Sequence, residues 1–159
     1  MKNLLAKDSL HFNIELSDRQ ATNYLNLLGN IHFINNAPAY INLNPSTIII
    51  NDAPWYLQDE NKMRVSKGKV YIDNLLLSQA EQQVKIDGVF SNKEEDQVKL
   101  MFNKFDLTSL NGITNPLGIQ LEGLLQGEIL VNSVFKKPII TSAIQTTPIL
   151  YNQFPIGKL

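Results

Sequence analysis

The sequence of 159 residues contains no cysteine, which excludes disulfides, cysteine-ligated metals and cysteine nucleophiles. Charge is also scarce, since Asp, Glu, Lys and Arg make up only 18% of the chain. The net charge of −1 offers no electrostatic basis for binding nucleic acid. A short apolar patch at residues 4–6 is too small for a signal peptide or a membrane-spanning helix. We therefore expect either a cytosolic protein or a segment whose targeting signal lies elsewhere.

What the sequence has in abundance is alternation of apolar and polar residues with a period of two, which is typical of half-buried strands. The clearest runs are Leu10–Leu16, Val84–Gly88, Val98–Phe102, Ile119–Gly123 and Ile129–Val131. Turn-forming residues such as Asn44-Pro45 and Lys67-Gly68 separate such runs. Strands at a spacing of roughly ten residues predict an antiparallel meander within a single β domain over residues 1–159.

The number of strands limits the architecture of this all-β fold. About a dozen strands at ~4.8 Å spacing would form a sheet on the order of 55 Å wide. Open sheets of that width usually curl or fold over. The possibilities are a closed β-sandwich, a closed barrel or a curled trough, and the pattern does not separate them.

Two segments are candidates for helices. Residues 17–28 could form a helix, because Ala21, Tyr24, Leu25 and Leu28 have helical spacing; a loop followed by a strand from about Tyr24 explains them equally well. Leu107–Gly112 could form one helical turn.

Catalytic and metal-binding constellations are weak. We interpret His11 and His32 as side chains of an exposed polar face, because no carboxylate has ligand spacing to them. Glu94, Glu95 and Asp96 follow a strand and are expected in a solvated hairpin turn. Nothing in the sequence brings together Asp73, Asp87 and Asp106. We predict no catalytic residue, cofactor or metal, and therefore no enzyme.

Aromatic and glycine residues have two interpretations each. Trp55 and Tyr56 could form an aromatic platform for sugar, but an isolated Trp at a strand end more often packs in a core. Gly118, Gly123 and Gly127 do not form a phosphate loop, since no switch from strand to helix follows them. We expect these glycines to permit bulges and bends in a sheet.

From Asn44 onward the order of sequence elements resembles the TamB family, relatives of the AsmA-like envelope proteins, and in particular its Bacteroidetes members. The elements are Asn44–Ile50 followed by Asn51–Trp55, the strand and turn Gln82–Ser91, the segment Phe105–Leu110, the glycine-spaced segment Leu121–Gly127, and the strands that begin at Pro138. The resemblance is firmest over residues 45–159. The chain ends at Leu159, where the family pattern would continue, so we expect a segment excised from a longer protein.

The resemblance implies a long curled sheet, a β-taco, with an apolar inner face that bridges the inner and outer membranes. It implies a periplasmic location, an inner-membrane anchor outside this chain, transport of phospholipid and a BamA-like outer-membrane partner. The alternation supplies candidates for the lipid-contacting residues, namely Val84, Ile86, Leu100, Phe102, Ile119, Leu121, Ile129 and Val131.

Three functions from different classes follow. The first is a groove that holds lipid acyl chains as cargo. The second is an assembly factor that guides outer-membrane proteins by adding their strands to an open sheet edge. The third is a carbohydrate-binding sandwich with Trp55 and Tyr56 as its platform.

Overall fold

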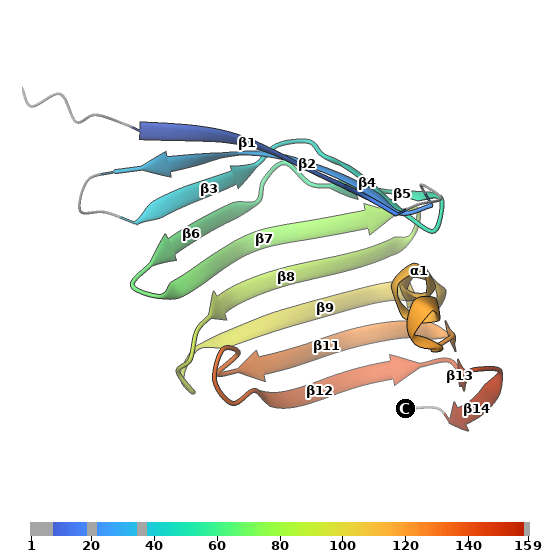
Figure 1. Ribbon diagram of the computed structural model, residues 1–159. Helices are drawn as coiled ribbons and strands as arrows, with labels where there is room; N and C mark the ends of the chain where they lie inside the picture. The colour runs from blue at the N-terminus through green and yellow to red at the C-terminus, as the bar shows by residue number, and fades with distance from the viewer. Residues whose placement is uncertain (1–7, 19–21, 35–37, 158–159) are drawn as a thin grey trace, which may run out of the picture.

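The computed structural model describes residues 8–18, 22–34 and 38–157, most of which lie in strands (Figure 1). The strands before the helical turns are β1 (Asp8–Ser17), β2 (Tyr24–Phe33), β3 (Ala39–Leu43), β4 (Thr47–Ile50), β5 (Ala53–Leu57), β6 (Lys62–Ser66), β7 (Lys69–Gln79), β8 (Gln82–Phe90) and β9 (Gln97–Asp106). The strands after them are β10 (Leu121–Glu122), β11 (Leu124–Asn132), β12 (Ile139–Thr146), β13 (Ile149–Tyr151) and β14 (Phe154–Gly157).

Eleven strands form one antiparallel sheet in which most consecutive strands are paired, while β3 pairs with β6. The order runs from β12 through β11, β9, β8 and β7 to β5 and β4, and then to β2 and β1. β3 and β4 both pair with β2, at different parts of its length, and β5 and β6 pair in the same way with β7. The short strands β3 and β4 therefore share one strand position across the sheet, and β5 and β6 share the next. The prediction of an all-β meander is confirmed, and the sheet is curled rather than closed into a barrel or sandwich (Figure 1).

Bulges interrupt the ladder and strengthen the local twist. In β7 the register shifts between Ile72 and Leu75, where Asn74 has a φ of 58° and donates its backbone N–H to the Asp87 carboxylate at 2.7 Å. β9 and β11 shift register beside Gly127, whose φ is 123°. The prediction that glycine permits irregularity is therefore confirmed at Gly127. Gly118 ends a helical turn, and Gly123 separates the two-residue β10 from β11, so neither lies within a strand of the large sheet.

Helical structure in the described part of the chain is confined to residues 107–117, which we call the helical segment. It consists of η1 (Leu107–Leu110), α1 (Asn111–Thr114) and η2 (Asn115–Leu117). The Asp106 carboxylate caps η1 by accepting the backbone N–H of Thr108 at 2.9 Å. The predicted turn at Leu107–Gly112 is confirmed. None of these helical turns has the length or apolar character needed to cross a membrane.

Helix formation over residues 17–28 is a prediction that the structure contradicts. Leu25 pairs with Leu16 of β1 on one side and with Ile48 of β4 on the other, so its backbone belongs to a strand. The alternative, a strand that starts at Tyr24, is what forms, while residues 19–21 lie outside the described residues. Tertiary pairing on both edges of β2 prevails over the helical spacing of a few apolar side chains.

The buried core lies at one end of the sheet. Trp55, Phe105 and Leu125 form what we call the end cluster, and Leu107 and Leu110 of the helical segment pack against it. Further half-buried residues that pack against it come from the large sheet, namely Ile48, Ile50, Leu77, Val84, Phe102 and Ile144. The helical segment therefore covers one end of the sheet, as Figure 1 shows for α1.

A second, three-stranded sheet of β10, β13 and β14 follows the helical segment. Leu121 pairs there with Tyr151, and its backbone N–H and C=O both bond the Asn111 side chain, at 2.8 and 2.9 Å. The predicted alternating strand over Ile119–Gly123 therefore forms only at Leu121–Glu122. Ile119 precedes β10, and only Leu121–Glu122 are in a strand, outside the large sheet.

Candidate functional site

One row of directly opposed residues crosses the whole large sheet and is apolar at every position. Residues that face each other across an antiparallel pair share one face of the sheet. The row, which we call the apolar row, consists of Leu10, Ile31, Ile41, Met63, Ile72, Gly88, Val98, Val131 and Ile140. At ~4.8 Å per strand it is about 38 Å long around the curl.

Six of the predicted lipid-contacting residues lie on the same face as the apolar row. Ile86 opposes Leu100, and Leu100 opposes Ile129. Val84 opposes Phe102 one step nearer the end cluster. Val131 belongs to the apolar row itself. Alternation along β8, β9 and β11 therefore places these side chains on one face, as the sequence predicted.

Ile119 and Leu121 are the two predicted lipid-contacting residues that do not join this face. Both follow the helical segment, and Leu121 is in the three-stranded sheet. Further members of the face that were not predicted from the sequence lie on the shorter strands and on β7, including Ile41, Met63 and Ile72. Each of these sits in a short period-two run, but the pairing of β3 with β6, which are not consecutive in the sequence, leaves no clear sequence signal.

The apolar face is covered by protein only in part. Val98 is 2% exposed, and Trp55 in the end cluster is 3% exposed. Toward both edges of the sheet the same face is open, since Leu16 on β1 is 60% exposed and Ile140 on β12 is 67% exposed. The six residues of the predicted set that reach this face are all half-buried. An extensive apolar surface left open in this way is uncommon in a soluble monomer and marks a contact site.

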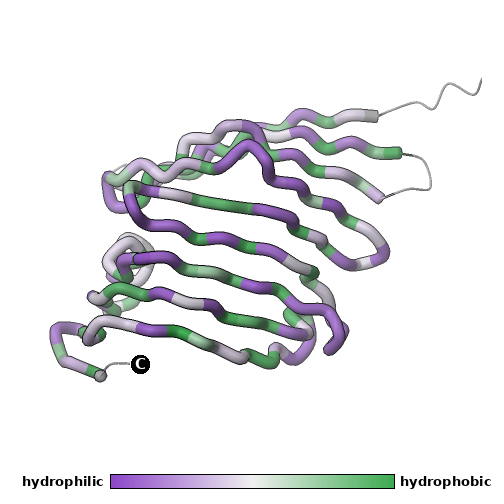
Figure 2. Tube along the Cα trace, turned by 180° about the vertical axis from the view of Figure 1, so that it is seen from behind, coloured by the Kyte–Doolittle hydropathy of each residue, from purple (hydrophilic) through white to green (hydrophobic). Residues whose placement is uncertain are grey.

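The opposite face carries most of the polar side chains, and several of its charged residues form ion pairs. Lys99 of β9 forms an ion pair with Glu128 of β11 at 2.5 Å, and Lys85 pairs with Asp87 within β8 at 3.1 Å. The tube in Figure 2 shows hydrophilic and hydrophobic positions alternating along the strands. Charge on one face and apolar side chains on the other make the sheet amphipathic.

Residues considered for chemistry are dispersed. His11 is exposed and His32 half-buried on the polar face, and Glu94 and Glu95 lie in the turn between β8 and β9 as predicted. Asp73 opposes Lys62, whereas Asp106 caps a helical turn at the other end of the strands. In the described ranges no three His, Asp or Glu side chains gather closely enough to hold a metal ion.

Trp55 and Tyr56 do not form a shared platform. Trp55 is buried in the end cluster, whereas Tyr56 is 62% exposed and, as the next residue in β5, points to the opposite face. The expectation that Trp55 packs in a core is confirmed. The sugar platform predicted from this pair is therefore wrong.

Comparisons with protein-family models, curated proteins and solved structures each return no match to this chain. The resemblance to the TamB family therefore stays a prediction, and the amphipathic sheet is the observation on which function is argued.

Proposed function

We propose that this chain is a segment of a TamB-like periplasm-bridging protein that holds lipid acyl chains on its apolar face during transport to the outer membrane. The observation that carries the proposal is the apolar row, which continues without a polar residue across every strand position of the large sheet. The periplasmic location, an inner-membrane anchor outside this chain and a BamA-like partner belong to the same proposal and rest on the resemblance in sequence.

Acyl chains suit this face for energetic reasons. Removing a methylene group from water contributes about 0.8 kcal/mol, so a chain of many methylenes is held without directional contacts. The face offers aliphatic and aromatic side chains and no charge along the apolar row, which matches a cargo that needs no specific polar recognition. The half-buried state of Leu100 and Ile129 leaves apolar area that a bound chain would remove from water.

A pair of adjacent substitutions tests the proposal. Leu100 and Met101 are neighbours in β9 and are both half-buried, but they lie on opposite faces. Leu100→Asp places a charge among the acyl chains, which is unfavourable, whereas Met101→Asp places it on the polar face, between Lys85 of β8 and Glu128 of β11. We expect native mass spectrometry of protein purified from cells to detect bound phospholipid in the wild type and in Met101→Asp but not in Leu100→Asp.

The same experiment separates a trough from a packed core. If both variants melt cooperatively at similar temperatures and only Leu100→Asp has lost lipid, the apolar face binds lipid. Unfolding of Leu100→Asp alone would mean that protein packs against Leu100, as it would in a sandwich core. Lipid-free wild-type protein would contradict the proposal directly.

A second candidate function is strand addition at an open edge. In the described residues β1 pairs only with β2, and β12 pairs only with β11, so the outer backbone groups of both strands have no ladder partner. An extended segment of an outer-membrane protein could pair with either edge through main-chain hydrogen bonds. This second function predicts that such a peptide slows amide hydrogen exchange in β1 or β12 and leaves the exchange rates in β8 unchanged.

A further inference from the structure

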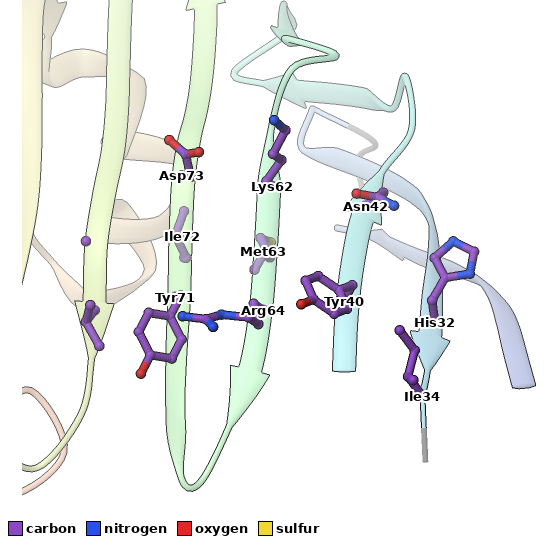
Figure 3. A pocket seen from close by; sticks show the side chains of 12 residues that line it. His32, Ile34, Tyr40, Asn42, Lys62, Met63, Arg64, Tyr71, Ile72 and Asp73 are labelled. Carbon is purple, nitrogen blue, oxygen red and sulfur yellow. The ribbon is translucent and has the colours of Figure 1, made fainter. Parts of the chain in front are cut away.

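A hollow of about 780 Å³ lies at the end of the sheet away from the helical segment, over β2, β3, β6, β7 and β8 (Figure 3). Its wall includes a second row of opposed residues, one position along from the apolar row and therefore on the polar face. This row runs through His32, Tyr40, Arg64, Tyr71 and Val89. The volume falls within the range of small-molecule sites in proteins.

The cations in this hollow are held without an acidic partner. Lys85, Lys99 and Lys104 elsewhere on the sheet each form an ion pair. Lys62 and Arg64 of β6 form none with the described residues, although Lys62 opposes Asp73 in the ladder. A site that concentrates two unpaired cations against one carboxylate favours an anionic ligand.

Arg64 is positioned by an aromatic ring. Its guanidinium carbon lies 3.9 Å from the centroid of the Tyr71 ring, and Figure 3 shows its side chain extended from β6 toward Tyr71 on β7. Stacking fixes the plane of the guanidinium while leaving the N–H groups at its edge able to donate, and these suit a carboxylate or phosphate. The orientation of the Arg64 guanidinium is therefore set before any ligand binds.

The remaining groups fit a ring that bears hydroxyls. The Tyr40 ring, opposite Arg64 on β3, is 42% exposed and offers an apolar face against which the C–H face of a sugar can pack. Asn42 and Asp73 line the same hollow and can bond hydroxyl groups. Aromatic faces, amide and carboxylate acceptors and a stacked arginine together match a saccharide that carries an acid group.

We infer that this hollow binds an acidic saccharide, with Arg64 and Lys62 on the anionic group and Tyr40 against a sugar ring. The site is independent of the proposed lipid function because it lies on the opposite face of the sheet. The acidic sugar could be free or could be the headgroup of a glycolipid, since both present the same chemistry.

Isothermal titration with trigalacturonate tests the inference, and its fully methyl-esterified form is the matched neutral probe. We expect the acid to bind and the ester to bind at least about tenfold more weakly, because the charge-assisted contacts to Arg64 and Lys62 are lost. Arg64→Gln and Lys62→Gln should each weaken binding of the acid by about tenfold. Lys104→Gln removes a charge at the opposite end of the strands and should leave binding unchanged.

Equal affinity for the acid and the ester, or an equal loss in Lys104→Gln, would overturn the inference, as would absence of binding by the acid. Tyr71→Phe keeps the ring beneath Arg64 and should retain most of the affinity, while Tyr71→Ala should lose it. Phosphatidylcholine vesicles with and without phosphatidylglycerol form a further arm. Binding that depends on phosphatidylglycerol and Arg64, without binding of trigalacturonate, would assign the hollow to a lipid phosphate and contradict the saccharide.

Discussion

Trp55 on β5 packs against Phe105 on β9 with the two ring centroids 5.9 Å apart, although β7 and β8 lie between their strands. In a flat sheet these positions would be about 14 Å apart. The two large side chains lean toward each other across the face that the sheet curls around. This contact fixes the curvature at the end that the helical segment covers, while the apolar face stays open toward the edges of the sheet, at Leu16 and Ile140.

The end cluster should therefore dominate the stability of the fold. We expect Trp55→Ala to lower the free energy of unfolding by about 3–5 kcal/mol, because it removes a buried aromatic side chain and leaves a cavity. Tyr56→Ala, at the next position and on the exposed face, should change it by less than about 0.5 kcal/mol. Urea unfolding followed by circular dichroism measures both, and equal effects would contradict the placement of the core.

Gly127 allows β11 and β12 to approach closely. A Cβ built on Gly127 would lie 2.2 Å from the carbonyl oxygen of Ala143 on β12, and its φ of 123° is unfavourable for other residues. Gly127→Ala should lower stability by more than about 2 kcal/mol and speed hydrogen exchange of β12. Gly68→Ala is the control, because Gly68 also has a positive φ, of 74°, but no atom within 4 Å of its Cβ position. A similar loss of stability in both variants would mean that the positive φ alone, and not the close approach of β12, accounts for the effect.

Asp96 makes the stability depend on pH in acid. The Lys69 ammonium, at 2.6 Å, and the Ser91 hydroxyl hold the pKa of the Asp96 carboxyl below its usual value. A depressed folded-state pKa contributes stability above the unfolded pKa of about 3.9, and this contribution is lost as pH falls through the folded pKa. Asp96→Asn should be less stable than the wild type at pH 7, with the difference shrinking below about pH 4. A difference in unfolding midpoint that stays constant from neutral to acid pH would rule out this role.

The sequence predicted the faces of single strands but not their alignment. Val98, Leu100 and Phe102 alternate within one run, so the pattern alone placed them together on one side of β9. The row through Tyr40, Arg64 and Tyr71 depends on the register among three strands, and β3 pairs with β6 although β4 and β5 lie between them in the sequence. The hollow could not be predicted for this reason.

The period-two pattern also gave a wrong prediction for a segment whose backbone is bonded by a side chain. Ile119–Gly123 has the same period-two pattern as the true sheet strands, but the Asn111 amide bonds both backbone groups of Leu121 and so occupies the edge of β10 that does not face β13. The sequence shows Asn111 as an ordinary polar residue after a possible helical turn. Only the fold reveals that its side chain takes the place of a strand partner.

Ile129 and Leu130 allow the most direct measurement of what the apolar face contacts. They are adjacent in β11, are both half-buried and branched, and lie on opposite faces. The photo-crosslinking residue p-benzoylphenylalanine would be placed at each position in turn, in the full-length protein in cells, and irradiated. We predict phospholipid adducts by mass spectrometry at position 129 and none at position 130. Equal labelling at both positions, or protein adducts alone at position 129, would contradict a lipid-holding face.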